Sequence, residues 1–110
     1  MDIQPKEVVT SGLYEKHLIE IIEYSIDTFG HVQACKYFNT ISHHVERLDN
    51  FYTYYPECRY IPTKSRMYRN IILDAHLIIY RLTAVRIEVL DIIHAASSIR
   101  KIREARKIKM

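Results

Sequence analysis

Three side chains in the C-terminal half of the chain are of the kinds that phosphate chemistry uses. Arg69 and Arg81 carry permanent positive charges, and His94 has an imidazole ring that can take up and release a proton near neutral pH. Cations that converge beside a group able to move protons can bind and stabilise a charged phosphate group. If the two arginines meet on one face of a sheet with His76 or His94, they form an anion-binding site.

A structural role for the same residues is the alternative. An arginine on a strand often pairs with a carboxylate on the neighbouring strand, and Glu88 and Asp91 are placed for such pairs. His94 ends a predicted strand, where a histidine can face a cleft or serve the packing of the core. The catalytic and the structural interpretations of Arg69, Arg81 and His94 therefore both stay open.

The chain ends in a strongly basic segment. Residues 100–109 contain six Lys and Arg side chains and one glutamate. Such a segment can contact nucleic acid or an acidic segment of a partner protein, or it can be a solvated chain end without a role. The candidates for contact with a target or partner are His76, Arg100, Lys101, Arg103 and Arg106.

Neither a metal nor another cofactor is expected. His31 and Cys35 are four residues apart on a predicted helix, but no second pair with metal-ligand spacing accompanies them. The adjacent His43 and His44 point apart on a helix. Cys35 and Cys58 stand in no motif for nucleophilic catalysis, and the chain has no glycine-rich phosphate loop.

The elements that must position these side chains begin with a short strand and two helices. Residues 7–10 read as a strand, which Ser11 and Gly12 end. Apolar residues then recur at three- and four-residue steps up to Phe29, which predicts an amphipathic helix closed by Gly30. The same period continues to residues 49–50. We therefore predict a hairpin of two helices.

The remainder of the chain is predicted to form an aromatic loop and three strands. Residues 51–62 have no period, and their tyrosines favour cover for the edge of the core over stacking on bases. Strands are expected at 66–73, 76–83 and 86–94, with turns at 74–75 and 84–85. From residue 97 the chain suits a short helix, which Ile99 and Ile102 would dock on the core, or a flexible tail.

This order of elements predicts an α+β fold. We expect a two-layer β-α-α-β-β-β arrangement in which the helical hairpin packs on a mostly antiparallel, twisted sheet. The opposite face of the sheet, or its edge, is expected to stay available to a partner. The hydrophobic content of 48% and the length of 110 residues fit one domain over residues 1–110.

The net charge of +3 is unevenly distributed. Residues 1–58 carry four Lys/Arg against nine Asp/Glu, a balance of −5, whereas residues 59–110 carry twelve against four, a balance of +8. This asymmetry indicates an anionic partner for the C-terminal half. The N-terminus lacks a secretory signal, and the longest apolar stretch is too short to span a membrane. We therefore expect a cytoplasmic protein that does not bind membranes.

The chain resembles RelE/ParE superfamily toxins of bacterial type II toxin–antitoxin systems. The resemblance covers residues 6–103. It depends on the order of the elements and on a set of short sequence pieces: Tyr24, Phe29-Gly30, Ala34 and Tyr37 in the helices, Leu48 ahead of Pro56, and the strand segments 68–71, 76–81 and 87–94.

The resemblance implies one of two activities. RelE-like members are ribosome-dependent endoribonucleases that cut messenger RNA, whereas ParE-like members poison DNA gyrase without cutting nucleic acid. In both branches an antitoxin segment wraps the toxin and neutralises it. The resemblance also implies that the toxin reaches operator DNA only through its antitoxin.

Two departures from the family pattern favour the ParE-like branch. Leu77 stands where ribonuclease-like members commonly have an arginine. Ser97 and Ser98 stand where many members have arginine and aspartate. We therefore expect a toxin that acts by binding its target. The alternatives are a ribosome-dependent ribonuclease that uses Arg69, Arg81 and His94, and a decayed toxin retained as a binding module.

Overall fold

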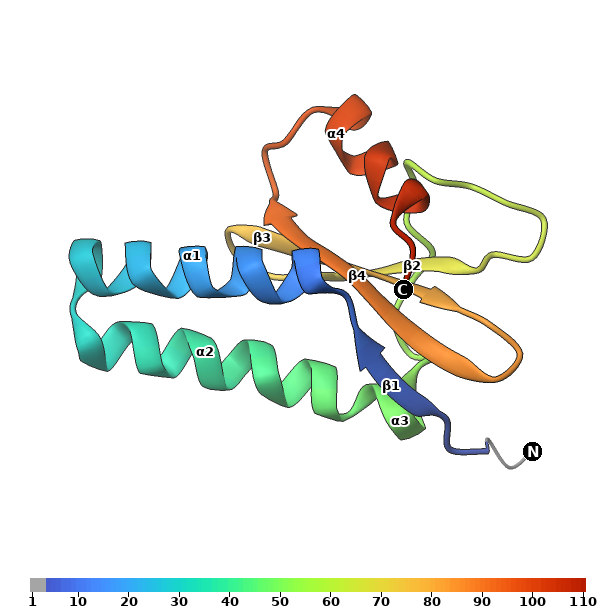
Figure 1. Cartoon of the computed structure of the whole chain (residues 1–110), viewed down its shortest axis with the longest axis horizontal. Coiled ribbons are helices and arrows are strands. Elements are labelled where there is room, and N and C mark those ends of the chain that lie inside the picture. The colour runs from blue at the N-terminus through green and yellow to red at the C-terminus, as the bar shows by residue number, and fades with distance from the viewer. Residues whose placement is uncertain (1–3) are drawn as a thin grey trace.

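A four-stranded mixed sheet carries a hairpin of two long helices on one face (Figure 1). The computed structural model describes residues 4–110. The elements are β1 (Glu7–Thr10), α1 (Gly12–Phe29), α2 (His31–Glu46), α3 (Leu48–Phe51), β2 (Tyr68–Ile72), β3 (His76–Leu82), β4 (Arg86–His94), α4 (Ile99–Arg103) and the 3-10 helix η1 (Glu104–Lys107). The predicted α+β fold and its helical hairpin are confirmed.

The strands lie in the order β1-β4-β3-β2. β2, β3 and β4 form an antiparallel meander, and β1 pairs in parallel with β4. A parallel pair needs a crossover connection, which the helical hairpin begins by leaving β1 and crossing one face of the sheet. β1 and β2 are consequently the two edges of the sheet.

Residues at its two ends define α1. The Ser11 hydroxyl accepts a hydrogen bond from the backbone N–H of Tyr14 at 2.9 Å, which caps the first turn of the helix. Gly30 has φ of 87° between α1 and α2, a conformation that residues with a Cβ rarely adopt. The boundaries predicted for this helix are therefore confirmed.

The main core lies between the hairpin and the sheet. Ile41 of α2 and Ile78 of β3 are fully buried there, among other aliphatic side chains of the sheet. Tyr80 is also fully buried, and its hydroxyl donates to the carbonyl of Tyr52 at 2.8 Å. Burial raises the pKa of Tyr80, so that the phenol stays protonated and keeps its donor role.

The opposite face of the sheet is covered, so the expectation that this face stays open to a partner is wrong, whereas the alternative of the sheet edge stays a prediction. Residues 56–67 and the C-terminal segment lie over it, and a second core forms beneath them. Cys58 and Ile61 come from the loop, and Ile102 and Ala105 come from the C-terminal helices. Ile99 does not dock as expected, because it lies half-exposed on the outer side.

An irregularity in the β3–β4 ladder changes which face of the sheet the side chains of β4 lie on. Simple alternation places Leu90 and Ile92 on the same face. The register shifts between Ile79 and Tyr80, where Tyr80 pairs with Val89 and Ile79 pairs with Asp91. This leaves one extra residue in β4, so Leu90 packs in the second core and Ile92 in the main core.

Candidate functional site

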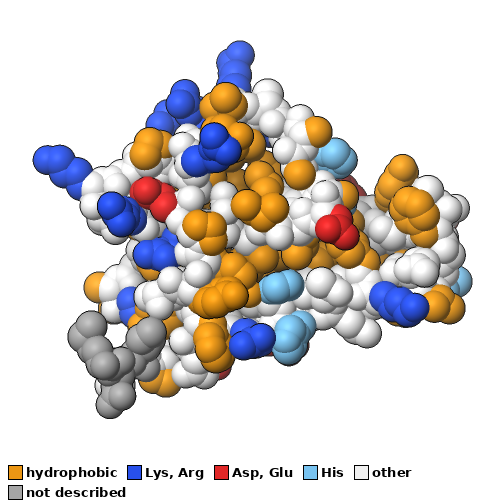
Figure 2. All heavy atoms as spheres, turned by 180° about the vertical axis from the view of Figure 1, so that it is seen from behind, with side chains coloured by type: hydrophobic (Ala, Val, Ile, Leu, Met, Phe, Trp, Pro, Cys, Tyr) orange, Lys and Arg blue, Asp and Glu red, His pale blue; other side chains and the backbone are white. Residues whose placement is uncertain are grey.

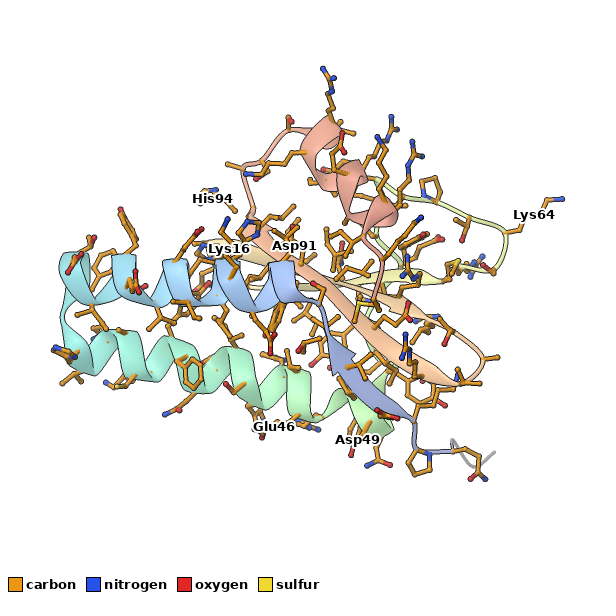
Figure 3. The ribbon with its side chains drawn as sticks, in the orientation of Figure 1. Lys16, Glu46, Asp49, Lys64, Asp91 and His94 are labelled. Atoms are coloured by element: carbon orange, nitrogen blue, oxygen red, sulfur yellow. The ribbon has the colours of Figure 1, made fainter. Side chains whose placement is uncertain are left out.

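A groove of about 830 Å³ runs between the helical hairpin and the ends of β3 and β4. It is lined mostly by apolar and aromatic side chains, with three histidines among them. The lining residues are His17, Glu20, Ile21, Tyr24, Ser25, Phe29, Gln33, Tyr37, Asp74, Ala75, His76, Ile92, Ile93, His94 and Lys101. Figure 3 shows His94 at the end of β4, beside α1.

The α1 side of the groove follows from helical spacing. His17, Ile21 and Tyr24 stand at steps of four and three residues, which places them on one stripe of the helix. Tyr24 is 64% exposed and Phe29 is 65% exposed, although both are large and hydrophobic. The groove therefore presents apolar surface that residues 4–110 leave uncovered.

A chain of three rings closes the end of the groove near the β3–β4 ladder. The Tyr37 hydroxyl lies 2.6 Å from Nδ1 of His76, and the rings of His76 and His94 are 5.6 Å apart between centroids. β3 and β4 bring the two histidines together because His76 and His94 are direct partners in the register. The hairpin supplies Tyr37 from α2, across the groove.

Burial determines the protonation of this chain of rings. Desolvation, followed by repulsion from His94, lowers the pKa of His76, so its imidazole is neutral at pH 7. Desolvation, followed by the charge of Asp74, raises the pKa of Tyr37. A protonated phenol that donates to a neutral imidazole satisfies both shifts.

A part-buried pair of an aspartate and a histidine joins α1 to β4. Oδ1 of Asp91 lies 2.6 Å from Nδ1 of His17 and accepts a hydrogen bond from the backbone N–H of Ile92 at 2.8 Å. Figure 3 shows Asp91 next to the first turns of α1. A buried carboxylate needs such partners, so this pair positions the helix against the strand and orients His17 at the groove.

Arg69 does not enter the groove. It lies opposite Tyr80 in the β2–β3 register, on the hairpin side of the sheet. Its guanidinium donates from Nη1 to the carbonyls of Thr53 and Tyr55 at 3.1 and 2.8 Å. Arg69 therefore holds the aromatic loop in place.

Arg81 lies on the other face of the sheet. It is opposite Tyr68 in the register, one position away from the Arg69–Tyr80 pair, and neighbouring pairs face opposite sides. Its Nε donates to Glu88 at 2.7 Å, and its Nη2 donates to the carbonyl of Ile108 at 3.2 Å. Arg69 and Arg81 therefore do not converge on one face, and of the two interpretations the ladder pair is confirmed for Arg81.

The other predicted residues divide between the groove and the surface. His76 and His94 meet in the groove, and Lys101 lines its rim. Arg100 and Arg106 are exposed, and Nε of Arg103 donates to the carbonyl of Tyr60 at 3.1 Å. The segment predicted as a short helix or a flexible tail is helical over α4 and η1.

Sequence reasoning missed the groove partners His17 and Tyr37 as site residues. Their contacts join residues 74 and 39 positions apart, which no local pattern reveals. The stripe at His17, Ile21 and Tyr24 was the one available signal, because it places a histidine on the same side of the helix as large apolar residues.

The groove suits apolar groups better than phosphates. Of the described residues that line it, Lys101 alone carries a permanent positive charge, while Glu20 and Asp74 are acidic. One ammonium group would stabilise a charged phosphorane only weakly. Within residues 4–110, no three His, Cys, Asp or Glu side chains are grouped so that they could hold a metal ion. None of the helices described is long and apolar enough to cross a membrane.

Comparison with known proteins identifies one family. Residues 8–99 match the family model described as ParE toxin of type II toxin–antitoxin system, parDE. A solved structure described as the chromosomal ParDE TA system from P. aeruginosa superposes with a TM-score of 0.67 at 16% identity, covering 84% of this chain and 98% of that one. Among curated proteins, none matches the sequence.

Proposed function

The chain belongs to the ParE toxin family of type II toxin–antitoxin systems, and we propose that a cognate antitoxin neutralises it by placing an apolar segment in the groove. The observation that carries this proposal is the groove itself, whose lining includes the exposed aromatic side chains of Tyr24 and Phe29. Exposed apolar surface of this kind marks interaction sites. A groove beside a helix pair accepts the apolar face of an amphipathic segment.

Charge supports the same occupant. Lys101 lies at the rim of the groove, and Arg100 is exposed beside it in α4. An antitoxin segment with apolar residues on one side and acidic residues on the other would bury the first in the groove and pair the second with these cations. The acids Glu20 and Asp74 on the lining would then select against a strongly anionic ligand deep in the groove.

We propose that the released toxin acts in the cytoplasm by binding DNA gyrase. The toxin–antitoxin pair would thereby contribute to plasmid stabilisation or growth control. A ribonuclease would need cations gathered at one place. Arg69 and Arg81 are each held by internal partners on opposite faces of the sheet, and Leu77 lies buried in the second core. These positions favour stoichiometric binding over phosphodiester cleavage.

Introducing negative charge into the apolar lining of the groove tests the antitoxin proposal. The variant Tyr24→Glu/Phe29→Glu places two carboxylates on the lining, and the matched control Ile19→Glu/Val32→Glu places them on exposed positions outside it, at 58% and 69% exposure. The probe is the purified cognate antitoxin, and titration calorimetry measures its affinity for each variant. We expect the affinity of the groove variant for the antitoxin to fall by about 100-fold or more, because each buried aromatic anchor contributes about 2 kcal/mol or more to the binding free energy. Equal losses in the two variants would contradict the proposal.

Three assays separate the possible targets. Purified gyrase should lose supercoiling activity in the presence of the full-length toxin, and unchanged supercoiling at excess toxin would count against the gyrase proposal. New 5′ ends on a ribosome-bound message would instead support the ribonuclease alternative. Growth that is unaffected by induction, with the antitoxin still bound in vitro, would identify a decayed toxin kept as a binding module.

A further inference from the structure

The loop before β2 and the C-terminal segment form one continuous surface, which adjoins the groove at Lys101. Arg103 of α4 donates to the carbonyl of Tyr60 in the loop, which ties the two segments together. Arg59, Lys64 and Arg66 of this loop are exposed. Figure 3 shows Lys64 projecting far out from the loop, at the opposite end of the molecule from the tip of the helical hairpin.

The C-terminal segment adds a denser set of charges. Ile102 and Ala105 bury one side of α4 and η1 against the sheet, so the remaining side chains of the two helices point to solvent. Six cations are exposed there: Arg100, Lys101, Arg103, Arg106, Lys107 and Lys109. We call these six together with Arg59, Lys64 and Arg66 the basic face.

Few acids balance the basic face. Residues 57–66 and 98–110 contain two carboxylates, Glu57 and Glu104. Oε2 of Glu57 accepts a hydrogen bond from the backbone N–H of Thr63 at 3.3 Å, and Glu104 lies 3.5 Å from Lys107 in an exposed pair. Figure 2 shows the Lys and Arg side chains gathered towards this end of the molecule. Nine cations against two acids produce a strong outward positive potential.

We propose that the basic face binds the phosphate backbone of a nucleic-acid duplex directly, which departs from the contact through the antitoxin alone that the family resemblance implies. Release of counterions from the phosphates drives such binding, and exposed Arg and Lys side chains without competing carboxylates are what it requires. The basic face shares Lys101 with the rim of the groove, but most of its cations lie outside the groove lining. The proposal therefore does not depend on whether the groove is the antitoxin site.

The aromatic residues of the chain argue against a single-stranded ligand. Proteins that bind single strands stack bases on exposed rings. The most exposed rings, such as Tyr24, Phe29 and Tyr54, lie on α1 or just after α3, outside the basic face. Tyr60 lies within the face, but it is half-buried and the Arg59 guanidinium sits 5.5 Å from its ring centre. Phosphate contacts are thus the main interaction that this surface offers.

An acidic protein segment is the less suitable ligand. Protein segments usually bind through apolar side chains buried in a pocket, with charge at the rim. Of the large hydrophobic residues in the two segments, Ile99 and Met110 are exposed, and each is only about half accessible. The apolar surface that would hold a peptide is in the groove.

Fluorescence anisotropy of the full-length protein with labelled DNA and RNA duplexes of about 20 base pairs tests the proposal, with affinity followed from about 50 to 200 mM salt. We expect affinity to fall steeply with salt. The variant Arg100→Gln/Arg106→Gln should lower the slope of log K against log salt by about 1.8, because each lost phosphate contact contributes about 0.9. Comparison of the two duplexes identifies whether DNA or RNA is the preferred source of the phosphates.

The matched control is Lys16→Gln/Lys36→Gln, which removes the same charge from exposed positions on α1 and α2. Its slope should stay at the wild-type value, and circular dichroism should show that both variants remain folded. Three results would overturn the proposal: no salt-dependent binding of either duplex, an equal loss in the control, or tighter binding of a single strand. Displacement of the duplex by poly-glutamate at equal charge concentration would also overturn it, in favour of an acidic protein partner.

Discussion

The groove and the basic face are built in opposite ways. The groove depends on contacts between distant parts of the chain, such as His17 with Asp91 and Tyr37 with His76. The basic face depends on two short segments whose charges are visible in the sequence, and the chain only has to hold them against the sheet. The first site therefore requires the complete fold, whereas the second requires only that its segments be docked.

The same contrast locates the positive charge of the C-terminal half. The sheet carries Arg69, Arg81 and Arg86, but carbonyls hold Arg69, and Arg81 and Arg86 both pair with Glu88. The outward charge comes from the loop and the C-terminal segment. A balance of +8 in the sequence is thus divided between structural arginines and the basic face.

Loss of Glu88 should have the largest effect. Glu88 is buried, and its two carboxylate oxygens accept from Nε of Arg81 and Nε of Arg86 at 2.7 and 2.9 Å. Glu88→Ala should lower the free energy of unfolding by about 4 kcal/mol, because it leaves a largely buried guanidinium without its partner. Urea denaturation measures the loss. In the control Glu104→Ala, which breaks an exposed pair, a change above about 1 kcal/mol would be unexpected.

The second-largest effect on stability is expected where the C-terminal segment docks on the sheet. Ile102 is 2% exposed and Ile99 is 49% exposed on the same short helix. Ile102→Ala should destabilise the protein by about 3 kcal/mol and loosen the basic face, whereas Ile99→Ala should change stability by less than about 0.5 kcal/mol. Thermal unfolding of the pair measures the difference. Similar melting temperatures in the two variants would show that the segment is not docked.

Two serine caps compare the regions at smaller magnitude. Ser11 caps α1, is buried, and also donates to the carbonyl of Leu90, whereas Ser98 caps α4 from an exposed position. Ser11→Ala should cost about 1.5 kcal/mol and Ser98→Ala about 0.5 kcal/mol. Chemical denaturation of the two variants checks the order. A larger loss of stability for Ser98→Ala than for Ser11→Ala would contradict the prediction that the buried cap contributes more.

The pH dependence of the groove should be the smallest effect. Desolvation and the nearby His94 lower the pKa of His76 in the folded state, so the unfolded chain takes up this proton first as the pH falls. The stabilisation that neutral His76 contributes is therefore complete above the ordinary histidine pKa of about 6.5. It declines as the pH falls towards the lower pKa that His76 has in the folded state.

The variant His76→Gln should flatten the decline of the urea midpoint between about pH 7.5 and about pH 5.5. Desolvation also lowers the pKa of His44, which lies beside Tyr55 outside the groove. The variant His44→Gln should consequently flatten the same curve in part, while leaving the affinity for the antitoxin unchanged. If the urea midpoint of His76→Gln depends on pH as that of the wild type does, His76 does not contribute to the pH dependence of stability.

Local patterns predicted the helices and most of the strands. The apolar period and Gly30 predicted the hairpin, because both act within a few residues. The strand predicted at 66–73 is shorter in the structure, since Arg66 adopts a left-handed φ of 54° and its N–H bonds back to Thr63. The preceding loop had no period, so its cover of the second face could not be foreseen.

Local sequence patterns could not predict which face of the sheet a side chain lies on, or which distant side chains come together. Arg69 and Arg81 fall on opposite faces because of the register between β2 and β3, which the sequence of either strand alone does not specify. The extra residue in β4 separates Leu90 from Ile92 in the same manner. The six cations of the C-terminal segment needed no such information, since exposure of a charged side chain on a short helix is the ordinary outcome.

The parallel pairing of β1 with β4 has a consequence for the order in which the toxin folds. Ser11 bonds to Leu90, 79 positions away, and β1 has no strand to pair with until β4 has been synthesised. Closing a loop of this size is slow compared with forming the hairpin or the meander. Emerging helices can therefore form early on the ribosome, but the groove between α1 and β4 is assembled only when the chain is nearly complete.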